Sequence, residues 1–166
     1  MRKVYTVTAS ALAEVPAETV YAILADYRDG HPHILPRRYF TSLSVERGGV
    51  GDGTVIRFGM RAFGKTRETR AAVTEPEPGR VLVETALEEG GPVTTFVVEP
   101  VGKSARVTFR TELTSRRGLA GAVERFLASR FLKRVYALEL AQLCDFARRL
   151  SGANLTNVWA QAGRCA

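Results

Sequence analysis

The sequence predicts an α+β protein in which a curved antiparallel sheet of about seven strands wraps around a long C-terminal helix. Three observations lead to this class. Segments that alternate apolar and polar residues follow one another between residues 40 and 115, separated by turn-forming residues and not by helices. Two short helices are expected after the first strand. A long helical pattern follows the last strand.

The amino-terminal part is expected to contain one strand and the two short helices. Residues 3–13 read as an extended strand, and the segment VPAETVYAILADY then changes to helical spacing. Pro16 suits the first turn of this helix, and Glu18 places negative charge near its start. The sequence DGHP ends the helix near Arg28, and a second short helical turn is expected before Pro36.

About six further strands are expected in the middle of the chain, with short turns that predict an antiparallel meander. Their segments are FTSLSVERGG, TVIRFGMRAFG, KTRETRAAVTEPEPGR, VLVETALEEGG, VTTFVVEPVG and ARVTFRTELTSR. In three of these segments the alternation predicts one mainly apolar face. The residues on that face are Ile56, Phe58, Met60, Val81, Val83, Thr85, Leu87, Val107, Phe109, Thr111 and Leu113. In the fourth segment this phase puts Glu84 and Glu88 on the opposite face.

Residues 119–150 are predicted to form the long helix. One apolar arc contains Leu132, Val135, Tyr136, Leu140, Leu143, Phe146, Ala147 and Leu150. A different arc contains Leu119, Val123, Leu127 and Phe131. Because the apolar face rotates near residues 129–132, we expect either a bend there or two halves that contact different neighbours.

A chain of 166 residues is large enough for one hydrophobic core. We therefore expect one domain over residues 1–150 and a C-terminal tail over residues 151–166. The tail has one charge and no sustained periodicity. This leaves two explanations, a mobile extension or a segment that Trp159 holds against the domain.

The composition is that of an ordinary globular protein, with 45% hydrophobic and 25% charged residues. The sequence contains neither a membrane-spanning apolar run nor a signal-peptide core, so a cytoplasmic location is expected. Cys144 and Cys165 lack the spacing of metal ligands and are expected to be reduced thiols.

The net charge of +7 comes from 20 arginines and 4 lysines that are scattered along the chain. No strip of basic residues with interleaved aromatic residues is present, and no nucleic-acid partner is expected. Transient contact with an anionic membrane surface stays open. A homodimer also stays open, because the strand near Val93–Glu99 could have an exposed edge.

A curved sheet around a helix encloses a space unless inward-pointing residues fill it, and several here are small or hydroxylic. The expected partner is therefore a hydrophobic small molecule. The sheet residues expected to contact it are Ile56, Phe58, Met60, Thr69, Val83, Thr85, Val97, Phe109 and Thr111. The long helix is expected to add Tyr136, Leu140 and Leu143, and Tyr27 is expected at the mouth.

Several segments together resemble the START-related (SRPBCC) ligand-binding superfamily with the helix-grip fold, and within it the polyketide cyclase/dehydrase-like branch. They are VPAETVYAILADY, GVGDGTVIRFGM, VTEPEPGRVLVET, FVVEPVGKSARVTFRTEL and GLAGAVERFLASRFLKRVYALELAQL. The likeness covers about residues 1–150. It implies an internal apolar pocket between the sheet and the long helix, entered beneath the loops that include residues 26–39.

The motifs for metal, nucleotide or covalent chemistry are absent from the sequence, so neither a metal nor a cofactor is expected. Acid–base chemistry stays open, with His31, Tyr136 and Arg67 as candidates. Arg67 points inward if its strand is regular, but a bulge or a strand end would turn it to water. Tyr136 also suits a core position, and His31 also suits a solvated loop.

Three functions follow as hypotheses. The leading one is binding of a lipid, isoprenoid or polyketide-like molecule in the cavity, with residues 26–39 as its gate. The second is a cofactor-independent cyclase or aromatase that uses acid–base residues in the same cavity. The third is a protein-interaction or stress module whose pocket is filled.

Overall fold

A computed structural model describes the backbone of residues 3–162 and the side chains of residues 3–152. Within this part of the chain, seven strands form one antiparallel sheet in the order β1-β7-β6-β5-β4-β3-β2. The strands are β1 Lys3–Ala13, β2 Phe40–Arg47, β3 Val55–Ala62, β4 Lys65–Glu77, β5 Val81–Ala86, β6 Val93–Val101 and β7 Ser104–Ser115. The helices are α1 Ala17–Ala25, the 3-10 helix η1 His31–His33, and α2 Gly118–Ala162. The predicted fold class is confirmed.

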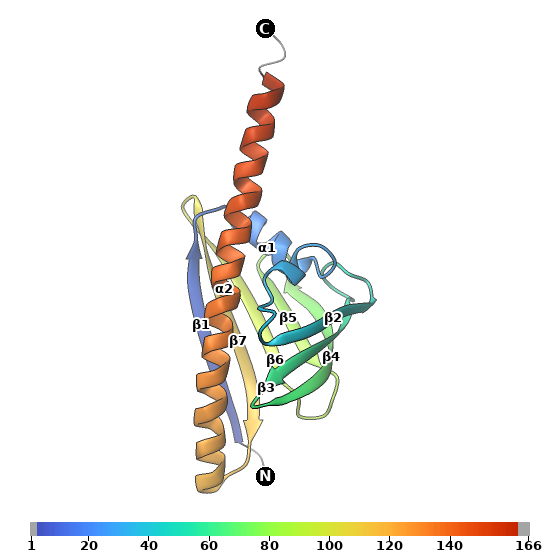
Figure 1. Cartoon of the computed structure of the whole chain (residues 1–166), viewed down its shortest axis with the longest axis vertical. Coiled ribbons are helices and arrows are strands. Elements are labelled where there is room, and N and C mark those ends of the chain that lie inside the picture. Colours follow the sequence, from blue (N-terminus) through green and yellow to red (C-terminus); the bar gives the residue numbers. More distant parts are fainter. Residues whose placement is uncertain (1–2, 163–166) are drawn as a thin grey trace.

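The sheet curves around α2, which lies along β1 and β7 (Figure 1). Strands β2 to β7 follow one another as hairpins, and β1 closes the order by pairing with β7 from Lys3↔Ser115 to Ala13↔Ala105. Helix α1 packs between β6, β7 and the carboxyl-terminal half of α2. This arrangement covers one end of the inner sheet face.

Helix α2 is longer than the sequence pattern indicated, because it continues past Leu150 to Ala162. The expected tail is therefore helical over residues 151–162, while the surroundings of Trp159 lie outside the described side chains. The helix is continuous, and its two halves have different environments. Leu119, Val123 and Phe126 are exposed, whereas the inward residues from Val135 onward are buried. The rotation of the apolar face near residues 129–132 thus separates an exposed first half from a buried continuation, and the two alternatives expected there stay predictions.

Two glycines define the start of α2. Gly118 has a φ of 80°, a left-handed conformation that a side chain would disfavour. At Gly121 a Cβ would collide with the carbonyl oxygen of Arg116, so the helix can begin this close to the preceding loop only without a side chain there.

The inner faces of β3, β4 and β7 agree with the alternation in the sequence, but the faces of β5 and β6 do not. Leu82 and Glu84 point inward, and Val83 and Thr85 point outward, because residues opposite one another in paired strands share a face. Glu84 stands opposite the buried Val73, and Val83 stands opposite the exposed Thr74.

In β6, Phe96 stands opposite Phe109 and is buried with it, so Val97 faces outward. Both faces of β5 and β6 carry apolar residues. Alternation alone therefore could not select the inner face.

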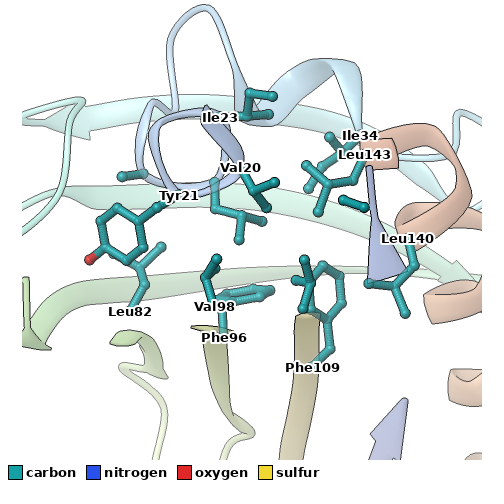
Figure 2. Close-up of a cluster of buried hydrophobic side chains, with 14 of the residues drawn as sticks. Val20, Tyr21, Ile23, Ile34, Leu82, Phe96, Val98, Phe109, Leu140 and Leu143 are labelled. Carbon is teal, nitrogen blue, oxygen red and sulfur yellow. The ribbon is translucent and has the colours of Figure 1, made fainter. Parts of the chain in front are cut away.

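The hydrophobic core fills the end of the sheet that α1 covers. Figure 2 shows side chains from α1, the sheet and α2 meeting there, among them Val20, Ile23, Ile34, Leu82, Phe96, Val98, Phe109, Leu140 and Leu143. The space between the other end of the sheet and the first half of α2 is left for a cavity. Among the described residues, no helix has the length and apolar character needed to cross a bilayer.

Candidate functional site

A cavity of about 950 Å³ lies between the inner sheet face, η1 and the first half of α2. Its apolar walls include Leu35, Phe40, Leu43, Ile56, Phe58, Met60, Phe96, Leu113, Phe131 and Leu132. Its polar lining includes His31, Thr69, Glu84, Thr94, Thr111, Tyr136 and Glu139. The volume lies within the range common for small-molecule sites, which is roughly 300–1,000 Å³.

The cavity opens at the end of the sheet away from α1. Its exposed lining residues come from the β3–β4 turn, the β5–β6 connection and the start of α2, and they include Phe63, Lys65, Arg67, Glu88, Glu89, Arg116 and Glu124. Residues 26–39 extend from the inner end, where His31 and Leu35 join the lining, to the mouth, where the centre of the Tyr39 ring lies 5.3 Å from that of Phe131. The entrance beneath these residues, which the family resemblance implied, stays a prediction.

The predicted ligand-binding residues divide into three groups. Six of them line the cavity, namely Ile56, Phe58, Met60, Thr69, Thr111 and Tyr136. Four are buried in the core instead, namely Tyr27, Phe109, Leu140 and Leu143. Val83, Thr85 and Val97 lie on the outer sheet face, because of the inverted phases of β5 and β6.

The turn after α1 positions His31. The Asp26 carboxylate accepts hydrogen bonds from the backbone N–H groups of Arg28 and Asp29 at 3.0 and 3.1 Å, which ends the helix. Gly30 then passes so close to the carbonyl group of Ile23 that a Cβ would clash. The chain folds back on α1, and His31 is only 4% exposed. The expectation of a solvated loop histidine is therefore wrong.

His31, Tyr27 and Glu84 form a polar cluster at the inner end of the cavity. The Tyr27 hydroxyl donates to Glu84 Oε1 at 2.6 Å, and His31 Nε2 lies 3.9 Å from the same oxygen. His31 Nδ1 lies 2.8 Å from the carbonyl oxygen of Leu24, which can only accept, so Nδ1 carries the proton. His31 Nε2, which faces Glu84, accepts a hydrogen bond when the ring is neutral and donates one when the ring is protonated.

Tyr136 and two threonines form a second polar group. The Tyr136 hydroxyl is bonded to Thr111, whose hydroxyl lies 2.8 Å from that of Thr94 on the neighbouring strand. Burial is the main cause that raises the pKa of Tyr136, so its hydroxyl keeps its proton at neutral pH. Tyr136 is thus both a core residue and part of the cavity lining.

Glu139 adds a second carboxyl one helical turn beyond Tyr136. It is 4% exposed, and no hydrogen bond or ion pair holds its carboxyl among the residues whose side chains are described. Burial raises its pKa well above the usual value, and the nearby charge of Glu84 raises it further. Within the same part of the chain, no three acidic, histidine or cysteine side chains are grouped to hold a metal ion.

Sequence reasoning missed both carboxyls. Glu84 was placed on the solvated face by the inverted phase of β5. Glu139 lies within the apolar arc of α2, between Val135 and Leu143, and a carboxyl inside an apolar arc is the signal that could have found it. Arg67, the third acid–base candidate, stands opposite Met60 in a regular part of β4 and lines the mouth of the cavity, where its side chain is exposed.

Solved structures share this architecture over most of their length. The KanY protein is 23% identical, with a TM-score of 0.77, over 88% of this chain and 99% of its own. The Zhui aromatase/cyclase from Streptomyces sp. R1128 is 18% identical, with a TM-score of 0.73, over 89% of this chain and 95% of its own. A START superfamily protein from Mycobacterium smegmatis is 14% identical, with a TM-score of 0.67, over 85% of this chain and 98% of its own. These likenesses show that the chain has the helix-grip fold.

The sequence assigns the chain more narrowly within this class. It matches the family described as polyketide cyclase / dehydrase and lipid transport over residues 5–145, and the chain belongs to that family. No curated protein sequence matches it. Family and fold together support a ligand-binding or cyclase role.

Proposed function

We propose that the protein binds a hydrophobic or amphipathic small molecule, such as a lipid, an isoprenoid or a polyketide-like compound, in the cavity between the sheet and α2. The observation that carries this proposal is the division of the cavity into apolar walls and a polar inner end. An apolar body would contact Ile56, Phe58 and Phe96, and a polar group would reach Glu84 and Glu139. An open cavity of about 950 Å³ also argues against the filled pocket of an interaction module.

The first experiment is native mass spectrometry of the freshly purified protein, followed by solvent extraction of any bound molecule. A near-stoichiometric apolar or amphipathic compound would support the proposal. A protein that carries nothing and also fails to bind the apolar fluorophore N-phenyl-1-naphthylamine would contradict it.

A cavity-filling substitution provides a sharper test. Met60 lines the cavity from β3, whereas Thr85 is exposed on the outer face of β5. We expect Met60→Trp to weaken binding of the fluorophore by about tenfold or more, because the larger ring occupies the ligand's space. The matched Thr85→Trp variant should bind like the unmodified protein. Equal affinities in fluorescence titrations of the two variants would place binding outside the cavity.

A cyclase is the second candidate function. The observation that favours it is that side chains able to accept or donate a proton lie together at the inner end of the cavity. Aldol ring closure needs a base that removes a proton next to a carbonyl and an acid that protonates the carbonyl oxygen. His31 Nε2 or Glu84 could serve as the base, and Tyr136 or Glu139 as the acid.

For this candidate we expect Tyr136→Phe and His31→Gln each to abolish turnover of a poly-β-ketone thioester while the fluorophore still binds. If the unmodified protein leaves such a thioester unchanged relative to buffer, the cyclase hypothesis fails and the binding function remains.

A further inference from the structure

The inner end of the cavity contains more hydrogen-bond acceptors than available donors. Its acceptors are the carboxyl groups of Glu84 and Glu139, and the Nε2 atom of His31 lies 3.9 Å from Glu84 Oε1. The Tyr27 hydroxyl already donates to Glu84, and the hydroxyls of Tyr136, Thr111 and Thr94 are bonded to one another. A ligand group that enters here is therefore required mainly to donate.

Glu139 shows this imbalance most clearly. Its side chain is buried, lines the cavity and has no hydrogen-bond or ion-pair partner among the described residues. A carboxyl enclosed in this way costs free energy unless water or a ligand in the cavity hydrogen-bonds to it, and an ionised one costs far more. Glu84 lies close enough for its charge to act on Glu139, so two acidic groups from different elements share one space.

No lysine or arginine side chain lines this end within the described residues, and the basic group there is His31, whose Nε2 atom lies 3.9 Å from Glu84 Oε1. The lysine and arginine side chains that line the cavity are Lys65, Arg67 and Arg116, and all three are exposed at the mouth. With two carboxyls and one imidazole, the inner end contains more acidic than basic groups. A ligand carboxylate or phosphate would meet like charge there.

We propose that the inner end of the cavity binds a protonated amine of the ligand, held between Glu84 and Glu139. An ammonium group offers several N–H donors and one positive charge, which match two carboxyls. This inference rests on the proposed binding function and specifies its ligand class. The ligand is an amphipathic amine whose apolar part lies against Ile56, Phe58 and Phe96.

Three matched probes test the inference on the full-length protein. They are 2-(2-naphthyl)ethylamine, the corresponding alcohol 2-(2-naphthyl)ethanol, and 2-naphthylacetate, which share an apolar ring and differ in the polar group. Isothermal titration at pH 7 should show the amine binding about tenfold or more tightly than the alcohol, because charge-assisted hydrogen bonds are roughly twice as strong as neutral ones. The carboxylate should bind most weakly.

Two variants assign the effect to the inner end. Glu139→Gln should weaken amine binding by about tenfold and leave alcohol binding within about twofold, because only the charge-dependent contact is lost. Glu88→Gln is the matched control, since Glu88 also lines the cavity but is exposed at its mouth. It should leave the affinities of all three probes nearly unchanged.

The outcomes separate the two proposals. If the alcohol binds and the amine has no advantage, or if Glu139→Gln changes both affinities equally, the amine site is wrong and cavity binding stands. If none of the three probes binds, both proposals fail. An amine preference that only Glu88→Gln removes would move the site to the mouth and overturn the inference.

Discussion

Glu139 and Glu84 show how single residues acquire their chemistry from what surrounds them. Exposed on a helix, a glutamate ionises near its ordinary pKa of about 4.3. At position 139 the carboxyl is enclosed by α2, the sheet and the cavity, and its pKa is raised by burial and by the charge of Glu84. Proton exchange at this position is therefore linked to folding.

This linkage predicts the pH dependence of stability. Because the folded pKa of Glu139 exceeds the unfolded one, the folded state binds more protons between the two values, and stability falls as pH rises through that window. Glu139→Gln removes the titration. Above pH 4.5 the free energy of unfolding of the variant should therefore rise relative to that of the unmodified protein. The full difference is about 1.4 kcal/mol for each unit by which the folded pKa of Glu139 exceeds the unfolded one.

Urea unfolding of both proteins between pH 4 and pH 8 measures the difference. The groups that face Glu139 are Glu84 of β5 and Tyr136 of α2, with His31 bound near Glu84. They are present in both proteins, but the coupling between Glu84 and Glu139 is lost in the variant, so the measured difference contains the Glu139 titration together with that coupling. A stability difference that does not change with pH would show that the Glu139 carboxyl ionises alike in the folded and unfolded states.

The β3–β4 hairpin shows strain at the scale of an element. Its strands pair up to Ala62↔Lys65, so the loop consists of Phe63 and Gly64, with φ values of 50° and 75°. Two-residue loops with two positive φ values favour Asn-Gly, and a bulky residue in this conformation is strained. Phe63 is 66% exposed at the cavity mouth, with its ring centre 5.3 Å from that of Phe131 on α2.

We expect Phe63→Asn to stabilise the protein by about 1 kcal/mol, because relief of the strained backbone exceeds the loss of a mostly exposed ring contact. Thermal unfolding should then show a midpoint about 2–4 °C higher. Leu87→Asn, at an exposed position beyond the end of β5, is a control for removal of a surface apolar side chain. A lower midpoint for Phe63→Asn would mean that the contact with Phe131 outweighs the strain.

At the scale of the whole molecule, exposed apolar residues and positive charge meet on α2 beside the cavity mouth. The outward face of its first turns carries Leu119, Val123 and Phe126, and Arg130 and Arg134 follow on that face. Apolar residues next to basic ones fit an anionic lipid surface, whereas a second copy of this face would bring like charges together.

We therefore expect the protein to sediment with phosphatidylglycerol-containing vesicles, and binding to fall as salt rises. Phe126→Glu should reduce the bound fraction severalfold by adding a negative charge to the contact face. Leu12→Glu, at an exposed apolar position of β1, should reduce it less. Equal losses of vesicle binding in both variants would indicate nonspecific attraction by net charge. A dimer that persists at high salt in size-exclusion chromatography would instead assign the face to self-association.

Features that depend on neighbouring residues were predicted from the sequence, and features that depend on contacts between distant segments were not. Strands such as β3 and β7 were predicted with their inner faces, because arginines mark the outer face of each at Arg57, Arg61, Arg106 and Arg110. In β5 and β6 both faces carry apolar residues, so pairing with β4 and β7 selected the inner one. The end of α2 was missed because a helix can continue where its apolar pattern stops.

The sequence by itself determined the order of the elements, the antiparallel sheet and the need for a long helix to cover it, because periodicity and turn residues act over a few neighbouring positions. Only the tertiary structure decided that His31 is buried, that Glu84 points inward and that Glu139 shares its space without a partner. Those properties depend on residues far apart in the chain, and the burial that sets their charge exists only after the sheet closes on the helix.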